Sequence, residues 1–185
     1  SNEKELGIGY LFAHQLLTTF DSTVSIKLEN SNIIISAPKA IPEPPVALDS
    51  TKKTSPTEIF RMTGHFQEKA ILFKETAICE SAALFDGDKI IYYAEDLDRD
   101  NAFYKTIGRR LLSEDKSSQL SLMTSSKVTS DMVQWAFNLG IPMIVSRTGV
   151  TFTAFQLADS LNITLIGFAR GRKLSAYCND HRISG

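Results

Sequence analysis

Three short segments of the chain combine cations with hydroxyl residues or glycine, which are groups that bind phosphate. They read SSKVTS at residues 125–130, SRTGVT at residues 146–151 and RGRK at residues 170–173. Arginine and lysine donate charge-assisted hydrogen bonds to phosphate oxygens, and the N–H groups that open a following helix add further donors. One such segment alone indicates no more than a solvated strand end. Three of them at one place in the fold would indicate an anion-binding site.

The pattern around these segments predicts that they meet at one edge of a sheet. From residue 119 onward, apolar runs typical of buried strands alternate with helical patterns. The predicted strands are LSLMT at 120–124, IPMIVS at 141–146 and ITLIGFA at 163–169. Short connections of this kind predict right-handed crossovers and parallel strands, and open α/β sheets bind ligands beyond the carboxyl ends of such strands. We therefore predict an anion site in the loops after Thr124, Ser146 and Ala169.

The preceding part of the chain predicts three regions. Residues 1–37 suit a small subdomain with a helix over 4–20 and a β-hairpin, and the abrupt start of this helix indicates a truncated piece. Residues 38–54 are rich in proline and predict a linker, because proline interrupts both helices and strands. Residues 55–185 form the predicted main α/β domain.

The main domain opens with a clear helix start. Ser55 can cap the helix, Pro56 suits its first turn, and Glu58 stands three residues after Ser55, so we predict a helix to about Glu75. The sequences AICESAALF and KIIYYAED predict paired strands around a turn at residues 86–88, and residues 100–113 predict a helix.

Composition limits the classes of partner. Lys and Arg total 20 against 21 for Asp and Glu, so the net charge of -1 gives no global attraction to nucleic acid or a membrane surface. The chain shows neither a membrane-length apolar run nor a secretion signal, and we expect a cytoplasmic protein. Its two cysteines form no CxxC pair and it has three histidines, so we expect no metal held by protein ligands.

The segment ICESAAL at residues 78–84 resembles the Cys-x-Glu half of a zinc deaminase site. Such enzymes also need a P-C-x-x-C element, and the later sequence has none. Cys79 lies in an apolar run typical of a packed strand, where a thiol is poorly accessible. Glu80 is either a residue that faces a ligand or a carboxylate at the end of a strand.

Several separated blocks resemble one protein family. EDLDRDNAFYKTIG at 95–108, LMTSSKVTSDMVQWAFNLGIPMIVSRTGVT at 122–151, ITLIGFARGRKLSAY at 163–177 and HRI at 181–183 resemble the accessory sulfurtransferase family required by formate dehydrogenases, the FdhD/NarQ family. The resemblance implies a three-layer α/β sandwich with a mixed, partly parallel sheet similar to the cytidine deaminase fold. It also implies a small α+β N-terminal subdomain and a homodimer.

The resemblance further implies a function. The family takes sulfur from a cysteine desulfurase and passes it, as a persulfide, to the molybdenum of bis(molybdopterin guanine dinucleotide) for formate dehydrogenase. GDP would then mimic a fragment of this cofactor. The matching motifs imply cofactor-binding roles for Phe168, Ala169, Arg170, Gly171, Arg172, Lys173, Ser125, Ser126, Lys127, Ser146, Arg147 and Thr148. Four more residues at the same predicted edge are candidate ligands: Asp96, Arg99, Asn101 and Glu80. The first three of these could instead form a helix cap with a surface ion pair.

Departures from the family pattern leave two hypotheses open. The family's persulfide cysteine has no counterpart in SAPKAIPEPPVALDSTKKTS at residues 36–55, so no catalytic residue is identified. Where the family has EDVGRHNA, this chain has EDLDRDNA, which places Asp98 and Asp100 at a glycine and a histidine position. Either a flexible loop with the cysteine is missing from this sequence and the chain is a sulfur-transfer protein, or the chain is a guanine-nucleotide or pterin-dinucleotide carrier that lacks transfer chemistry.

Overall fold

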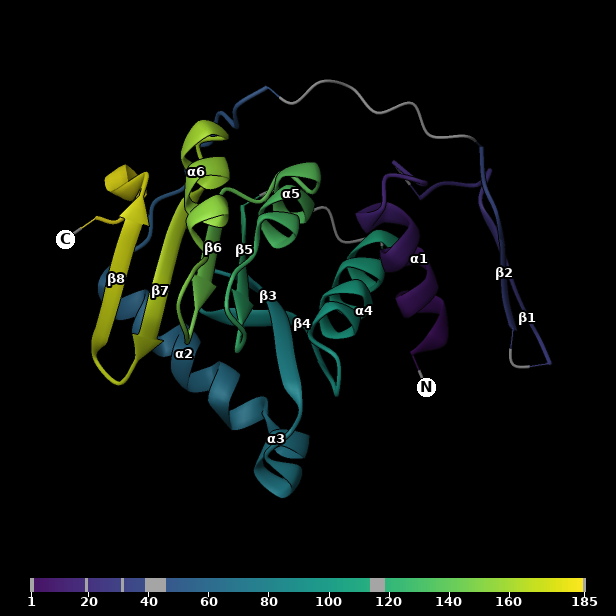
Figure 1. Cartoon of the computed structure of the whole chain (residues 1–185), viewed down its shortest axis with the longest axis horizontal. Helices are drawn as coiled ribbons and strands as arrows, with labels where there is room; N and C mark the ends of the chain where they lie inside the picture. The colour runs from purple at the N-terminus through teal and green to yellow at the C-terminus, as the bar shows by residue number, and fades with distance from the viewer. Residues whose placement is uncertain (1, 19, 31, 39–45, 114–118, 185) are drawn as a thin grey trace.

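The computed structural model describes residues 2–18, 20–30, 32–38, 46–113 and 119–184. Its strands are β1 Ser25–Glu29, β2 Asn32–Ser36, β3 Glu80–Asp86, β4 Lys89–Asp96, β5 Leu120–Thr124, β6 Met143–Ser146, β7 Thr164–Arg170 and β8 Lys173–Cys178. Its helices are α1 Glu3–Ala13, α2 Pro56–Lys69, α3 Ile71–Thr76, α4 Arg99–Leu112, α5 Ser130–Asn138 and α6 Phe152–Ser160, with a 3-10 turn, η1, at Asp180–Arg182. Strands β3 to β8 form one mixed sheet in the order β4-β3-β5-β6-β7-β8, and β1 and β2 form a separate hairpin (Figure 1).

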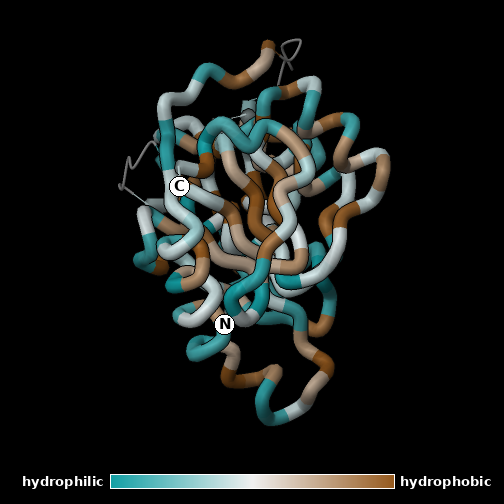
Figure 2. Tube along the Cα trace, turned by 90° about the vertical axis from the view of Figure 1, so that its left-hand side faces the viewer, coloured by the Kyte–Doolittle hydropathy of each residue, from teal (hydrophilic) through white to brown (hydrophobic). Residues whose placement is uncertain are grey.

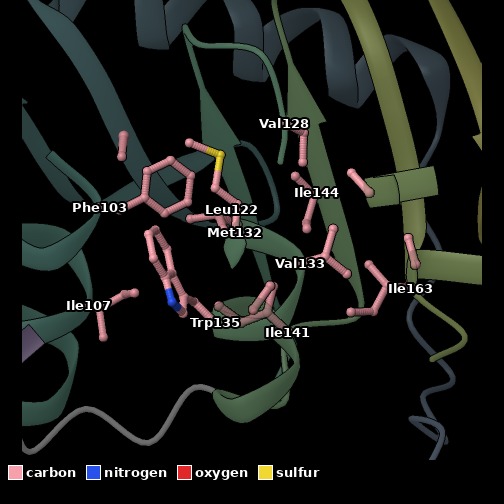
Figure 3. Close-up of a cluster of buried hydrophobic side chains, with 14 of the residues drawn as sticks. Phe103, Ile107, Leu122, Val128, Met132, Val133, Trp135, Ile141, Ile144 and Ile163 are labelled. Carbon is pink, nitrogen blue, oxygen red and sulfur yellow. The ribbon is translucent and has the colours of Figure 1, made fainter. Parts of the chain in front are cut away.

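The sheet forms the middle of three layers. Its strands carry apolar residues on both faces, and they form the hydrophobic centre of the trace in Figure 2. On one face, Phe103 of α4 and Trp135 of α5 pack over Leu122 and neighbouring strand residues (Figure 3). On the other face, a second core cluster places Phe66 of α2 with buried residues of β3, β5, β6 and β7. The predicted α/β class with a mixed sheet is confirmed, whereas the likeness to the cytidine deaminase fold stays a prediction.

The strand order bears out the central prediction about connectivity. β5 pairs in parallel with β6, and β6 with β7, while β3, β4 and β8 join through antiparallel pairs. Helices α5 and α6 connect the parallel strands and lie on the same side of the sheet (Figure 1). The carboxyl ends of β5, β6 and β7 therefore lie at one end of the sheet, which we call the carboxyl edge.

Helix α1 packs closely on α4. A Cβ added at Gly9 would lie 1.8 Å from the carbonyl oxygen of Tyr104, and one added at Gly108 would lie 1.8 Å from that of Glu5. Phe12 is buried in the same core cluster as the sheet residues. The described N-terminal region thus contributes to the main core, and the domain division at residue 37 stays a prediction.

Two predicted helices are shorter in the structure. The helix predicted over 4–20 ends at Ala13, because Gln15 adopts a left-handed backbone (φ 57) that lets Leu17 turn back into the core. The helix predicted over 55–75 breaks at Ala70, where ψ is 71. A new helix, α3, starts there because the carboxylate of Glu95 accepts the N–H groups at its beginning. No proline or glycine stands at either break, so local sequence does not predict where these two helices end.

Part of the predicted linker is attached to the main domain. Residues 39–45 lie outside the described residues, but Leu48 donates its N–H to Leu161 O at 3.0 Å and accepts from the Asn162 amide at 2.7 Å. Thr54 forms a parallel bridge with Ile183. Residues 48–54 are therefore fixed at both ends, to the residues that follow α6 and to the C-terminal turn. Within the described ranges, no helix has the length and apolarity needed to cross a membrane.

Candidate anion-binding site

The three predicted loops meet at the carboxyl edge through backbone hydrogen bonds. The Arg147 N–H donates to Thr124 O at 3.1 Å, which joins the end of β6 to the end of β5. The Phe168 N–H donates to Thr148 O at 2.8 Å, which joins the β6 loop to β7. The segments 125–130, 146–151 and 167–170 therefore form one continuous surface, as the alternation of strands and helices predicted.

Hydroxyl groups of this edge hold the loops in position. Ser146 donates to Ser126 O at 2.7 Å and accepts the Thr148 N–H at 3.0 Å. Ser125 accepts the Ser81 N–H at 2.9 Å and donates to the carboxylate of Glu80. These hydroxyls are engaged within the protein, so their first role is to order the loops. The buried Ser126 hydroxyl, by contrast, has no hydrogen-bond partner among the residues that the structure describes.

Two arginines concentrate positive charge at this edge. Arg147 is partly buried, and its Nε is fully buried with no hydrogen-bond partner within the described ranges. Burial, and then the positive charge of Arg170, hold the pKa of Arg147 below its usual value. Among the described residues, neither guanidinium forms an ion pair with a carboxylate. Two like charges in such an arrangement favour an anion that can accept hydrogen bonds from both.

The RGRK segment differs from its predicted form as a loop at the end of a strand. β7 continues to Arg170 and turns at Gly171, whose φ is +61, directly into β8. Glycine adopts this left-handed conformation without steric cost. Arg172 and Lys173 are exposed on this hairpin, as Lys127 is on its own loop. Ala169 is fully buried in the core under α2, so its side chain does not face a ligand.

Phe168 is displayed at the edge by an unusual backbone. It has φ 51, a value uncommon outside glycine, and its side chain remains 42% exposed. The ring packs over Gly149, where an added Cβ would lie 3.3 Å from Phe168 Cζ. The guanidinium carbon of Arg170 lies 5.9 Å from the ring centroid, within cation–π range. Backbone strain of this kind is frequent at binding sites.

A hollow beside this edge was not predicted from the sequence. It has a volume of about 350 Å³ and is lined by Val150, Thr151, Phe152, Phe155 and Tyr177. The Tyr177 ring covers Gly167, where an added Cβ would lie 2.9 Å from it. These aromatic residues lie on α6 and β8, and their spacing in the sequence gives no signal that they share a surface.

The other end of the edge is acidic, and its carboxylates accept hydrogen bonds: Glu80 from Ser125, and Asp96 from Lys105. Glu80 and Asp96 are direct partners in the β3–β4 ladder. Burial opposes ionisation of Asp96, but hydrogen bonds from Lys105 and the Asp98 N–H outweigh it, so its pKa is below the usual value. Asn101 donates to the same carboxylate at 3.4 Å. This network favours the alternative of a cap with an ion pair for Asp96 and Asn101.

The neighbouring helix start explains two departures from the family pattern. Asp98 is the N-cap of α4, and its carboxylate accepts the N–H groups of Asp100 and Asn101 at 2.8 and 3.0 Å. Arg99 pairs with Asp100 at 2.9 Å, and this hydrogen bond raises the pKa of Arg99. Arg99 thus has a local carboxylate partner, unlike Arg147 and Arg170.

Both cysteines are buried. Cys79 is 7% and Cys178 is 9% exposed, and burial raises the pKa of Cys178 to about 11. Neither thiol lies in the exposed, electropositive setting that activates a thiolate nucleophile. Within the described part of the chain, no group of three or more His, Cys, Asp and Glu side chains is placed to hold a metal ion.

Comparisons with known proteins agree on one family. The sequence model of the FdhD/NarQ family matches residues 35–184. A sulfur carrier protein FdhD from Listeria innocua is 32% identical over 139 residues, which cover 75% of this chain and 53% of the relative. One from Wolinella succinogenes is 38% identical over 128 residues, which cover 68% of this chain and 42% of the relative. The chain thus spans about half the length of these curated relatives.

The fold also has a solved counterpart. The crystal structure of a candidate formate dehydrogenase accessory protein from Desulfotalea psychrophila superposes with a TM-score of 0.85 at 25% sequence identity. The match covers 99% of this chain and 79% of that one. The two proteins therefore share the same overall fold.

Proposed function

Because this chain belongs to the FdhD/NarQ family, we propose that it is a formate dehydrogenase accessory protein that binds a phosphate-bearing cofactor at its carboxyl edge. The observation that carries this proposal is the pair Arg147 and Arg170. Their guanidinium groups are close enough to influence each other, and within the described ranges neither is neutralised by a carboxylate. A phosphate group supplies the missing negative charge and accepts charge-assisted hydrogen bonds.

The family resemblance gives the cofactor of this proposal as bis(molybdopterin guanine dinucleotide). Its pyrophosphates would be held by Arg147 and Arg170, with the exposed Arg172, Lys173 and Lys127 adding positive charge. The exposed Phe168 ring and the adjacent aromatic hollow of about 350 Å³ offer flat surfaces for a planar base. The molybdenum of the bound cofactor would supply the sulfur-accepting chemistry, while the protein positions it.

The two hypotheses about sulfur differ in what they require of a cysteine. Transfer, as the names of the FdhD relatives imply, needs a thiolate on an accessible segment. Cys79 and Cys178 are both buried, and the sequence has two cysteines in total. This observation favours a carrier that binds the cofactor without forming a persulfide on its own thiols. Incubation with a cysteine desulfurase and cysteine, followed by intact-mass analysis, separates the two: a gain of one sulfur atom supports transfer.

The partners in this proposal follow from the same resemblance. They are formate dehydrogenase as the recipient and a cysteine desulfurase as the sulfur source, with the protein acting as a homodimer in the cytoplasm. Size-exclusion chromatography with light scattering tests the dimer. Co-purification with each enzyme tests the two partners separately.

Titration calorimetry with GDP, and with ADP as the control nucleotide, tests the binding site. We expect guanine-selective binding that Arg170→Ala weakens by about tenfold to a hundredfold, which corresponds to one charge-assisted hydrogen bond of about 1.5 to 3 kcal/mol. Arg61→Ala is the matched control, because Arg61 lies on α2 and pairs with Asp88. If Arg170→Ala binds GDP as tightly as Arg61→Ala, the cation pair is not the phosphate site.

A further inference from the structure

A buried arginine with no ion-pair partner among the described residues lies at the opposite end of the sheet. Arg182 belongs to the 3-10 turn η1, which follows β8 and lies beside the amino end of β7 (Figure 1). Only 1% of Arg182 is exposed, which makes it the largest fully buried side chain among the described residues. Arginine is rarely buried without a partner, so its surroundings need an explanation.

The hydrogen bonds of Arg182 occupy one nitrogen. Nη1 donates to Asn162 Oδ1 and to Thr164 Oγ1, both at 3.3 Å. Nε and Nη2 are buried and have no hydrogen-bond partner in the part of the chain that the structure describes. Because the guanidinium is planar, these two nitrogens lie on the same side of the group. Together they form the two-pronged edge that donates parallel hydrogen bonds to the two oxygens of a carboxylate or phosphate.

Arg182 also has no carboxylate in direct contact among the described residues. No ion pair joins it to a carboxylate within the described ranges, and Asp49 is the acidic residue whose charge reaches it. Burial holds the pKa of Arg182 below its usual value, which reflects the free energy of keeping this charge out of water. Water molecules could satisfy the two N–H groups, but they would leave the buried charge without a counterion.

Further polar groups surround this end of the sheet. Thr54 donates its N–H to Arg182 O at 2.9 Å, and the buried Thr54 hydroxyl has no partner for a hydrogen bond in the described part of the chain. In the same segment, Lys52 is 5% exposed; its Nζ donates to Gln119 O, and the negative charges of Glu58 and Asp86 act on it. These groups belong to the segment before α2 and to the C-terminal turn, so an anion bound between them would link both to the sheet.

We propose that the Nε and Nη2 edge of Arg182 binds a small oxyanion of the carboxylate or phosphate class. This site is separate from the carboxyl edge and does not depend on the function proposed above. Its role is structural: the occupied site fixes residues 48–54 and the C-terminal turn against β7. The stability of the protein should therefore depend on the anion in solution.

Thermal unfolding of the full chain at constant ionic strength tests this site. Formate, acetate and inorganic phosphate are each compared with chloride. At a concentration tenfold above its Kd, a bound oxyanion should raise Tm by about 3 to 6 °C. The increase should disappear in Arg182→Lys, which keeps the charge but loses the two-pronged edge. It should remain in Arg170→Ala, which removes a cation of the carboxyl edge.

A second measurement on the unmodified protein does not depend on folding of the variants. In ¹⁵N NMR spectra, the Nε–H signal of Arg182 should shift in a saturable way with the same anion that raises Tm. Three results would overturn the proposal: no anion-specific change in Tm, a change that disappears in Arg170→Ala instead, or an Nε–H signal that does not respond. A loss of stability in Asp49→Asn with no response to anions would identify Asp49 as the counterion and would also overturn it.

Discussion

The contact between α1 and α4 allows a sharp prediction about stability, with Gly9→Ala as the perturbation. A Cβ at this position would lie 1.8 Å from Tyr104 O and 2.5 Å from Tyr104 C. Both atoms belong to the backbone of a helix, so they cannot move aside as the end of a flexible side chain could. The two helices must separate, and overpacking of this kind typically costs 1–3 kcal/mol, about 1 kcal/mol of which the better helix propensity of alanine offsets.

Gly64→Ala is the matched control. Gly64 also lies inside a helix, but an added Cβ there meets no atom within 4 Å. Alanine should therefore stabilise α2 by about 0.5 to 1 kcal/mol through its propensity alone. The same chemical change should have opposite effects on the free energy of unfolding at the two positions.

Urea unfolding followed by tryptophan fluorescence measures the difference. Trp135, the one tryptophan of the chain, lies 5.2 Å from the Tyr104 ring between centroids, so it reports on the α1–α4 contact. We expect Gly9→Ala to have a lower urea midpoint than the parent protein, and Gly64→Ala a higher one. Equal midpoints for the two variants would show that α1 does not pack on α4 as described.

Three further predictions concern a helix cap, a carboxylate and a thiol. Ser55→Ala should lower the free energy of unfolding by about 1 kcal/mol, because the Ser55 side chain accepts an N–H of α2. The Thr129 side chain accepts no such N–H from α5, so Thr129→Ala should have a smaller effect in the same urea assay. The pKa of Asp96 is lower in the folded than in the unfolded protein, so its carboxylate stabilises the fold above about pH 4, and this stabilisation is lost as pH falls through the folded-state pKa. Asp96→Asn should therefore lose less stability in acid than the parent protein. Equal pH profiles of the free energy of unfolding would contradict this. Because burial raises the pKa of Cys178 to about 11, its reaction with a thiol reagent at pH 8 should be much slower in the folded protein than in denaturant, and equal rates would refute its burial.

Much of the fold followed from local patterns. The alternation of apolar runs and helical segments after residue 119 correctly predicted β5, β6, β7 and their parallel pairing. The turn at residues 86–88 correctly predicted the pairing of β3 with β4. These features depend on hydrophobic periodicity and on turn residues, and both involve residues that are close together in the sequence. The helix boundaries at Ala13 and Lys69 were missed because they depend on long-range burial and on the Glu95 carboxylate.

The candidate site was likewise predictable in its local features and unpredictable in those that depend on long-range contacts. The spacing of cations after successive strands predicted that the loops would meet, and they do. Sequence could not distinguish the unpaired Arg147 from Arg99, which has a carboxylate partner, because pairing depends on which side chains the tertiary structure brings together.

The sequence by itself determined the α/β class, the parallel strands and the edge at which basic loops gather, since each depends on periodicity and chain order. The tertiary structure alone decided which charges remain unpaired and which groups are buried. Arg147 and Arg182 are ordinary cations in the sequence. Once the strands and turns pack, Nε of Arg147 and both Nε and Nη2 of Arg182 are buried with no hydrogen-bond partner among the described residues. Desolvation of a charge depends on neighbours far away in the chain, and it is this property that makes both arginines candidates for anion binding.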